Sequence, residues 1–376
     1  MDFSLNEEQR MLRDSVERFV RGSYPIELRR KSVHEQDSFN PEVWRQFAEL
    51  GWLALPFAEE DGGLGGSLIE TMVVLEAFGK GLVVEPYIAT VVTGGGFLRR
   101  ADADQKARWL APLIEGSLQA AFAVDEYEQV HDLTQTAMHA RRTPDGYLLQ
   151  GSKACVLNGD RADLLIVLAR TSGEPGDDHG LSLFLVDAGT AGISRKPHRT
   201  VDGQRGAEIG FEQVRLSADA LLGELGQGLA LARTVVQETV LALGAEAVGA
   251  LAVLLHDTVE YARTRKQFGV AIGSFQALQH RMADMFMACE QTRSLLLAAT
   301  LKTHEQHADA ALAVHALKVQ IGSGGRRVAQ EAVQLHGGMG MTDELAIGHY
   351  FKRLTAIDAL FGNADRHALA YARASA

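Results

Sequence analysis

The chain has 376 residues, of which 46% are hydrophobic and 23% charged, with only 8 prolines, and this balance predicts a globular protein with a large core and two or three cooperating substructures. The net charge of −11 and the lack of any Lys/Arg block argue against nucleic acid as a partner, and the two cysteines, Cys155 and Cys289, are too few for a disulfide framework. We therefore expect a cytoplasmic protein without membrane insertion, because we find neither a signal peptide pattern nor an apolar stretch near the roughly 20 residues that cross a bilayer.

Residues 1–118 are predicted to form an N-terminal α-helical domain. Apolar residues recur at helical spacing through this segment, and Val16 and Val20 lie on one such stripe. Asn40 precedes Pro41, a pair that is typical of a helix start because the amide caps the first turn and the proline ring fits it.

Residues 119–222 are predicted to form a middle β domain. Short apolar runs alternate here with turn signals such as Pro144-Asp145-Gly146, which is typical of antiparallel strands. The expected strands lie at 121–124, 147–149, 164–168, 181–186 and 209–216.

Residues 223–376 return to long helical periods and are predicted to form a C-terminal helix bundle. The expected helices lie at 229–266, 274–304, 308–335 and 344–374. The three segments together predict a mainly α protein with a middle antiparallel β domain.

Two motifs resemble signatures of one enzyme family. The stretch YARTRKQFG at 261–269 is followed by FQALQHRMADM at 275–285, and QLHGGMGMTDE occupies 334–344. With weaker matches along nearly the whole length, the chain resembles the acyl-CoA dehydrogenases. The resemblance implies an α lobe, a β-barrel-like domain and a four-helix bundle. It also implies FAD, an acyl-CoA substrate in fatty acid β-oxidation, an electron-transfer flavoprotein as acceptor, and a tetramer.

The resemblance also implies which residues contact FAD. Arg265 offers a planar guanidinium for the pyrophosphate of a flavin bound mainly by the neighbouring subunit. Gly337 and Gly338 let backbone N–H groups approach the same dinucleotide, with Gln334 close by and Phe268 presenting an aromatic face.

The family's usual catalytic base is missing. In most members a Glu directly before a glycine near the last helix removes the α proton, but here Phe361 precedes Gly362, and a phenyl ring cannot accept a proton. A minority of members carry the Glu on the helix before the first motif, where this chain has Thr239. The two candidate substitutes are Glu238, the neighbour of Thr239 in sequence, and Asp358, three residues before Phe361.

The residues expected around the flavin ring are also altered. The segment 124–132 retains only Glu126 and Asp132 of the family pattern, and Cys155 and Leu157 stand where Trp and Thr are usual. Lys153, Asn158 and Gly159 are retained, and we expect Asn158 to contact the cofactor. The donors that tune the ring are thus largely absent.

The chain thus retains the residues expected to contact a neighbour's FAD but lacks the base. In this combination it resembles the small subunits of heteromeric bacterial acyl-CoA dehydrogenases, such as the pimeloyl-CoA type and those of steroid side-chain degradation. We therefore expect a heterotetramer in which a homologous subunit supplies the base. The alternatives are a self-sufficient homotetramer with a displaced base, a flavin oxidase or monooxygenase, and a non-catalytic structural or acyl-CoA-binding subunit. The histidines show no metal-ligand spacing, so we expect no metal site.

Overall fold

The computed structural model describes residues 5–34, 39–128 and 131–375. The chain divides into two compact units. The helical unit comprises Met1–His34, Leu68–Val84 and Val240–Ala376, and the sheet unit comprises Glu35–Ser67 and Glu85–Thr239. Each unit collects separate stretches of sequence, whereas the three predicted segments are contiguous; that three-part division stays a prediction.

The sheet unit is built on eight strands in the spatial order β6-β7-β3-β2-β4-β5-β8, with β1 added alongside β4. Their bounds are β1 Ala120–Ala123, β2 His139–Thr143, β3 Gly146–Leu157, β4 Leu164–Arg170, β5 Leu181–Asp187, β6 Ile193–Arg199, β7 Arg205–Ser217 and β8 Leu221–Leu222. The pairing is antiparallel except that β4 runs parallel to β1 and, at one residue pair, to β2.

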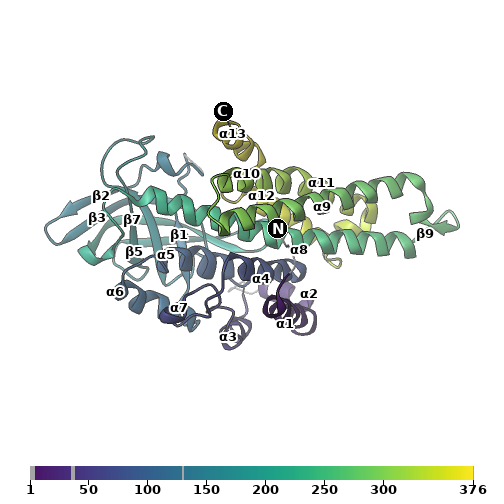
Figure 1. Ribbon diagram of the computed structural model, residues 1–376, viewed down its shortest axis with the longest axis horizontal. Helices are drawn as coiled ribbons and strands as arrows, with labels where there is room; N and C mark the ends of the chain where they lie inside the picture. The colour runs from purple at the N-terminus through teal and green to yellow at the C-terminus, as the bar shows by residue number, and fades with distance from the viewer. Residues whose placement is uncertain (1–4, 35–38, 129–130, 376) are drawn as a thin grey trace. The chain divides into compact units, whose positions relative to one another are not determined.

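The predicted strands lie where the sequence is most apolar. Every residue of β4 is buried, as a strand covered on both faces requires. The sequence missed β2 and β6 because both are polar strands without an apolar run: β2 reads HARRT and β6 reads ISRKPHR. Figure 1 shows β2, β3 and β7 side by side as long neighbouring strands.

Short helices complete the sheet unit: α3 Pro41–Glu49, α5 Gly95–Leu98, α6 Ala103–Gln105 and α7 Ala111–Ile114, with π-helical stretches at Ile88–Gly94 and Lys106–Leu110. The predicted helix start is confirmed, because the Asn40 side chain accepts a hydrogen bond from the Glu42 N–H at 2.9 Å and Pro41 occupies the first turn. The helix α8, Gly228–Thr264, begins in this unit and continues in the helical unit.

The helical unit contains the remaining helices and a small hairpin. Their bounds are α1 Glu7–Ser23, α2 Ile26–His34, α4 Leu68–Gly81, α9 Gln276–His304, α10 Ala310–Gln320, α11 Arg326–His336, α12 Ile347–Ala359 and α13 Ala364–Ala374, with the hairpin strands β9 Lys266–Gln267 and β10 Val270–Ala271. In Figure 1 the long helices α8 and α9 run side by side to the tip that carries β9.

Two predicted helices differ from the structure. The segment 308–335 contains a π-helical stretch at Ile321–Gly325 between α10 and α11, where the sequence is Ile-Gly-Ser-Gly-Gly. The predicted helix at 344–374 is broken between α12 and α13, because Phe361 and Gly362 adopt positive φ values of 56° and 100°. A left-handed backbone cannot continue a right-handed helix.

The expectation about apolar stretches needs a correction. Among the described residues α8 is long and apolar enough to cross a membrane, with a mean hydropathy of 1.8 over its most apolar window. However, 78% of that window is buried inside the structure. The core helix of a globular protein has this pattern, because it is apolar all round where it is surrounded by protein.

Candidate cofactor and active site

Arg265 lies where α8 ends and the β9–β10 hairpin begins. Its backbone N–H donates to the Tyr261 carbonyl at 2.8 Å, and its own carbonyl accepts from Ile272 at 2.8 Å, so the backbone is fixed on both sides. The guanidinium is exposed and has no hydrogen bond or ion pair to another described side chain. The structure therefore holds the Arg265 backbone firmly while leaving its charge available.

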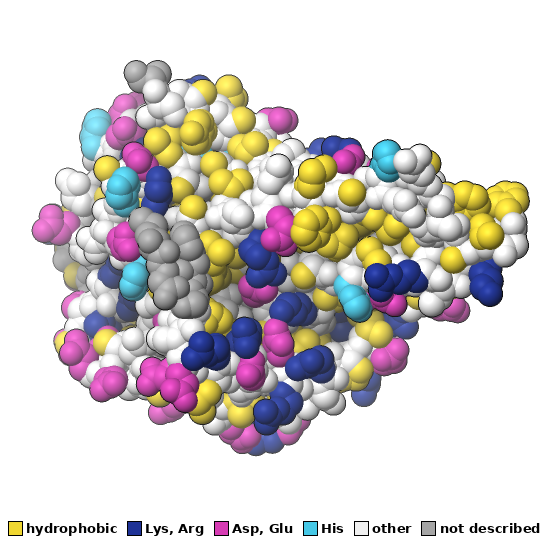
Figure 2. All heavy atoms as spheres, turned by 45° about the vertical axis from the view of Figure 1, so that its right-hand side comes forward, with side chains coloured by type: hydrophobic (Ala, Val, Ile, Leu, Met, Phe, Trp, Pro, Cys, Tyr) yellow, Lys and Arg dark blue, Asp and Glu magenta, His cyan; other side chains and the backbone are white. Residues whose placement is uncertain are grey.

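Phe268 forms the turn of the hairpin and is 92% exposed, with a positive φ of 54° followed by Gly269 at 81°. Its ring contacts Phe275 edge-on, with centroids 6.3 Å apart. Figure 2 shows hydrophobic side chains gathered at this end of the molecule. A large exposed aromatic side chain beside further exposed apolar residues is typical of a surface that binds a ligand or another protein.

Gly337 ends α11 with a φ of 58° and a ψ of −139°, a conformation that favours glycine. A β-carbon built on Gly337 or Gly338 would meet no other described group within 4 Å, so the turn is open on its outer side. By contrast, Gly340 is packed, since a β-carbon there would lie 2.7 Å from the Val333 carbonyl oxygen. Gln334 is exposed one turn earlier on α11.

The two motifs meet inside the helical unit through Tyr261 and His336. The Tyr261 ring stacks on the imidazole with centroids 4.4 Å apart and an interplanar angle of 27°. His336 is buried, and its Nδ1 lies 2.8 Å from the Ala332 carbonyl oxygen. Arg265 follows Tyr261 by one helical turn and Gly337 follows His336 directly, so the stack places both motifs at one end of the unit.

These residues fit a dinucleotide cofactor. A free guanidinium supplies charge-assisted donors for phosphate, and an open glycine turn lets a ligand approach the backbone closely, although the Gly337 N–H itself donates to the Gln334 carbonyl. An exposed aromatic ring supplies an apolar face for a flat ring system.

The position of the usual base carries no titratable group. Phe361 is half-buried in the turn between α12 and α13, and its carbonyl lies 3.0 Å from Nε2 of His367. Beneath the turn the fully buried Lys318 donates to the carbonyls of Ile357, Asp358 and Gly362 at 2.8, 2.7 and 2.7 Å. Burial lowers the pKa of Lys318 to about 7, and the Asp358 carboxylate opposes that shift.

Both candidate substitute acids are already paired. In the sheet unit, buried Glu238 accepts from Arg99 and Arg100, the latter at 2.7 Å. In the helical unit, buried Asp358 pairs with Arg326 and accepts the Ala364 N–H at 3.0 Å, which caps the start of α13. These contacts give each carboxylate a structural role as the partner of neighbouring arginines.

Thr239, the residue at the alternative base position, is also engaged. Its hydroxyl lies 3.0 Å from that of Thr93 and donates to the Val235 carbonyl at 2.8 Å. It is fully buried in the sheet unit and has no carboxylate.

Asn158 lies buried in the turn after β3 and has a φ of 59°. Its side-chain amide lies 3.4 Å from the Ala120 carbonyl oxygen and 3.5 Å from the Thr90 hydroxyl. Asparagine tolerates this left-handed conformation better than most residues. The structure thus gives Asn158 contacts within the sheet unit.

Two of the residues retained around the expected flavin ring, Glu126 and Lys153, form one largely buried network. Lys153 Nζ donates to Glu126 at 2.7 Å and to the Val124 carbonyl at 2.9 Å, and Glu126 also accepts from the backbone of 137 and 138. Burial lowers the pKa of Lys153, although the Glu126 carboxylate opposes the shift. Gln129 and Val130 of the predicted segment lie outside the described residues.

Cys155, at the usual tryptophan position, is exposed and has a φ of 49° in a β-bulge of β3. Partial burial raises the pKa of its thiol, and the Asp125 carboxylate acts in the same direction. The Cys155 side chain is therefore a neutral thiol, not a thiolate, at physiological pH.

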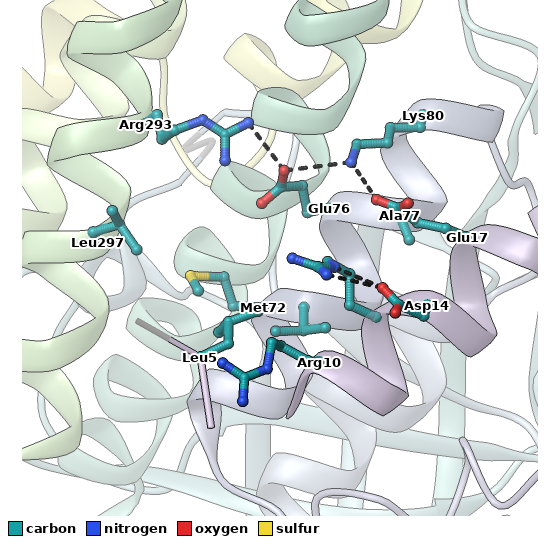
Figure 3. A pocket seen from close by; sticks show the side chains of 12 residues that line it. Leu5, Arg10, Asp14, Glu17, Met72, Glu76, Ala77, Lys80, Arg293 and Leu297 are labelled. Carbon is teal, nitrogen blue, oxygen red and sulfur yellow. Dashed lines mark hydrogen bonds and ion pairs between the residues drawn. The ribbon is translucent and has the colours of Figure 1, made fainter. Parts of the chain in front are cut away.

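A surface cleft of about 670 Å³ lies elsewhere in the helical unit, lined by α1, α4 and α9 (Figure 3). Its acids are paired: Glu76 contacts Arg293 at 3.0 Å, and Glu17 contacts Lys80 at 2.6 Å. The described residues contain no cluster of three or more His, Cys, Asp or Glu side chains that could hold a metal ion.

Three family models match the sequence in order. The acyl-CoA dehydrogenase N-terminal domain matches residues 6–117, the middle domain 121–216 and the C-terminal domain 226–376. The chain belongs to the acyl-CoA dehydrogenase family.

Individual relatives of the family agree with this assignment. A Bacillus subtilis protein named "Probable acyl-CoA dehydrogenase YngJ" is 31% identical over 99% of this chain and 99% of its own length. The ChsE4-ChsE5 complex from Mycobacterium tuberculosis contains a chain that is 27% identical, with a TM-score of 0.90 over 99% of this chain and 98% of that one. "PigA with FAD and proline" has a TM-score of 0.91 at 28% identity over 99% and 98%.

Family membership confirms the predicted fold, the cofactor FAD and an oxidoreductase activity on CH–CH bonds. FAD-dependent dehydrogenation of acyl-CoA-like substrates is thus the activity of the family to which this chain belongs.

Sequence reasoning did not single out the Tyr261–His336 stack or Lys318 as parts of the site. Both aromatic residues lie within the matched motifs, so their spacing to Arg265 and Gly337 could have suggested a contact. Lys318 offered no such signal, because a lysine in a helical stretch is usually solvated and only burial reveals its partners.

Proposed function

We propose that this chain is the subunit of a heteromeric acyl-CoA dehydrogenase that contributes Arg265, Phe268 and the 334–338 segment to an FAD held mainly by a homologous partner chain. One observation carries the proposal. The Arg265 guanidinium has no hydrogen bond or ion pair to another described side chain and the 337–338 turn is open on its outer side, whereas the acids that could replace the base are paired with arginines.

The reaction explains why the base matters. When bound, FAD accepts the hydride equivalent from the acyl β-carbon, and a carboxylate must take the α proton at hydrogen-bond distance. Phe361 has no lone pair for that proton, so at this position the chain contributes shape and apolar surface only.

Neither substitute acid is well suited to act as the base. A general base must present a free lone pair to the substrate. Two arginines at Glu238, and one arginine with a backbone N–H at Asp358, already occupy the carboxylate oxygens. We infer that the partner chain supplies the base.

The remaining predictions belong to the same proposal. The substrate is an acyl-CoA thioester, the electron acceptor an electron-transfer flavoprotein, and the assembly a heterotetramer in the cytoplasm. The likeness to a chain of the ChsE4-ChsE5 complex supports a heteromeric assembly. Asn158 is the least supported of the proposed cofactor contacts, because its amide faces groups of its own unit.

The test is to purify the chain alone and together with a homologous acyl-CoA dehydrogenase chain from the same organism, and to measure flavin per chain and acyl-CoA-dependent reduction of an artificial acceptor. We expect little FAD and no turnover for the chain alone, and both in the complex. Full flavin occupancy with turnover by the chain alone would show a self-sufficient homotetramer and reject the proposal.

Two further measurements on the complex distinguish a structural subunit from an oxidase. If Arg265→Ala leaves the FAD content of the complex unchanged, the chain is a structural or acyl-CoA-binding subunit that does not share the cofactor. If the complex consumes oxygen faster than it reduces the artificial acceptor, it is an oxidase or monooxygenase.

A further inference from the structure

The turn between α12 and α13 has an unusual backbone. Phe361 has a φ of 56°, which bulky L-residues rarely adopt, and Gly362 has a φ of 100°. A β-carbon on Gly362 would lie 3.1 Å from Arg366 Cδ and 3.2 Å from His367 Nε2, so a side chain there would be crowded as well as strained by the positive φ. A turn of this kind persists only where surrounding groups hold it.

Lys318 holds the turn from α10. Its Nζ lies 2.7–2.8 Å from three carbonyl oxygens, two at the end of α12 and the third on Gly362. An ammonium has three N–H donors, so the three acceptors satisfy it completely inside a fully buried site. The same contact neutralises part of the negative end of the α12 dipole.

Two histidines hold the turn from the other side, and the geometry fixes their tautomers. His367 Nε2 lies 3.0 Å from the Phe361 carbonyl oxygen, which can only accept, so Nε2 carries the hydrogen. In neutral His367 the Nδ1 atom therefore carries no hydrogen and can only accept a hydrogen bond. Nδ1 of His315 lies 2.9 Å from that atom, so it must be the donor. The result is a directed chain of N–H donors from His315 through His367 to Phe361.

We propose that His315, His367 and Lys318 form a titratable clamp on the Phe361–Gly362 turn, which tolerates one proton on the histidine pair and opens on the second. The inference does not depend on the proposed function, because every group in it belongs to the helical unit.

The order of protonation follows from the tautomers. A first proton on Nε2 of half-buried His315 leaves its Nδ1–H pointing at His367, so the hydrogen bonds from His315 through His367 to Phe361 stay intact. A second proton must go to Nδ1 of His367, where it faces another N–H and breaks the contact. Two imidazolium ions then also lie close to Lys318.

The charged surroundings resist that second proton. Lys318 of α10 and Arg366 of α13 are positive, while Asp358 of α12 is paired with Arg326 of α11. Burial, together with Lys318, His315 and Arg366, lowers the pKa of His367 to about 4, although the hydrogen bond to Phe361 opposes the shift. Burial also lowers the pKa of His315.

The direct test is ¹⁵N NMR of the full chain labelled at histidine, with the two residues assigned from single His→Gln variants. At neutral pH we expect the Nε2–H tautomer for His367 and the Nδ1–H tautomer for His315. The opposite tautomer at His367 would overturn the clamp, and it is read from the wild-type spectrum once the two residues are assigned.

Hydrogen exchange then reports the opening. The Leu360 N–H donates to the Ala356 carbonyl at the end of α12, just before the turn, and the Ala364 N–H donates across the turn to the Asp358 carboxylate. After correction for intrinsic rates, we expect their protection to persist while His315 titrates and to fall roughly tenfold or more as His367 titrates. Protection that falls with the first proton, or does not fall at all, contradicts the proposal.

Matched variants isolate the second proton. In His367→Gln the side-chain amide can still donate to Phe361 but cannot be protonated, so protection should lose its acid dependence. His280→Gln, an exposed histidine at the start of α9, should keep the wild-type acid dependence. Equal acid dependence in both variants would count against the clamp.

Discussion

The rings of Tyr261 and His336 stack 4.4 Å apart and join the end of α8 to the end of α11. Neither residue is assigned a contact with FAD, but Arg265 follows Tyr261 by one helical turn and Gly337 follows His336 directly, so we expect the stack to help position both. We expect Tyr261→Ala to weaken FAD binding by the complex about tenfold, because the loss of one aromatic contact loosens both gripping segments. Isothermal titration with FAD measures the effect.

Tyr261→Phe is the matched control for the stack. It keeps the ring and loses only the hydroxyl, which donates to the His336 carbonyl at the long distance of 3.4 Å. We expect FAD binding near the wild-type value. If Phe is as damaging as Ala, the hydroxyl rather than the stack positions the site.

Arg265 and Arg263 lie two residues apart at the same helix end and provide a matched pair. Arg265 has no partner among the described side chains, while Arg263 pairs with Glu260 at 2.7 Å on the surface. We expect Arg265→Ala to weaken FAD binding by the complex roughly 10- to 100-fold, the effect of a lost charge-assisted contact of about 1.5–3 kcal/mol. Arg263→Ala should change it less than about twofold. Equal losses would indicate a general charge effect.

The local conformation of these two segments could be predicted from the sequence because the motifs that carry them are short, while their contact with FAD stays a prediction. Arg265, Phe268 and the 337–338 turn each occupy a short stretch whose conformation follows from a helix end and glycine positions. The types of many elements could also be predicted, since a continuous apolar run such as β4 indicates a strand buried on both faces.

Other features depend on contacts between distant residues, which periodicity does not report. The polar strands β2 and β6 form only because neighbouring strands pair with them. The break at Phe361 requires Lys318, about forty residues away, to stabilise a left-handed turn in an otherwise helical pattern. The arginine partners of Glu238 and Asp358 likewise could not be predicted from the sequence, so both acids were candidates for the catalytic base.

Glu238 provides a test of structural against catalytic use. Its side chain is 8% exposed, and its partners Arg99 and Arg100 are 27% and 32% exposed. We expect Glu238→Gln to lower the free energy of unfolding by on the order of 2–3 kcal/mol, since two partly buried guanidinium groups lose their counter-charge. Urea unfolding followed by circular dichroism measures it.

Turnover separates the two roles of Glu238. If the pair is structural, the folded Glu238→Gln complex keeps kcat within about threefold of wild type, whereas loss of a general base costs about 100-fold or more. Glu260→Gln, which removes an exposed acid from the same helix, should leave both stability and turnover nearly unchanged.

The His367 imidazole makes the stability of the helical unit depend on acid pH. Its pKa falls from an ordinary 6.5 to about 4 in the folded protein, chiefly through burial. The unfolded chain therefore binds more protons than the folded chain between these two values, so stability is complete above about pH 6.5 and is lost as the pH falls toward 4. The shift corresponds to on the order of 3 kcal/mol.

Many carboxylates also titrate in this window, so the variant comparison decides the assignment. We expect the free energy of unfolding of His367→Gln to fall less steeply than that of wild type between pH 6.5 and 4, with the two curves parallel above pH 6.5, where His367 is neutral in both states. The exposed His280→Gln variant should follow the wild-type slope. A difference between wild type and His367→Gln that is constant across the whole range would mean that the substitution changes packing alone, and that the buried imidazole does not carry the acid sensitivity.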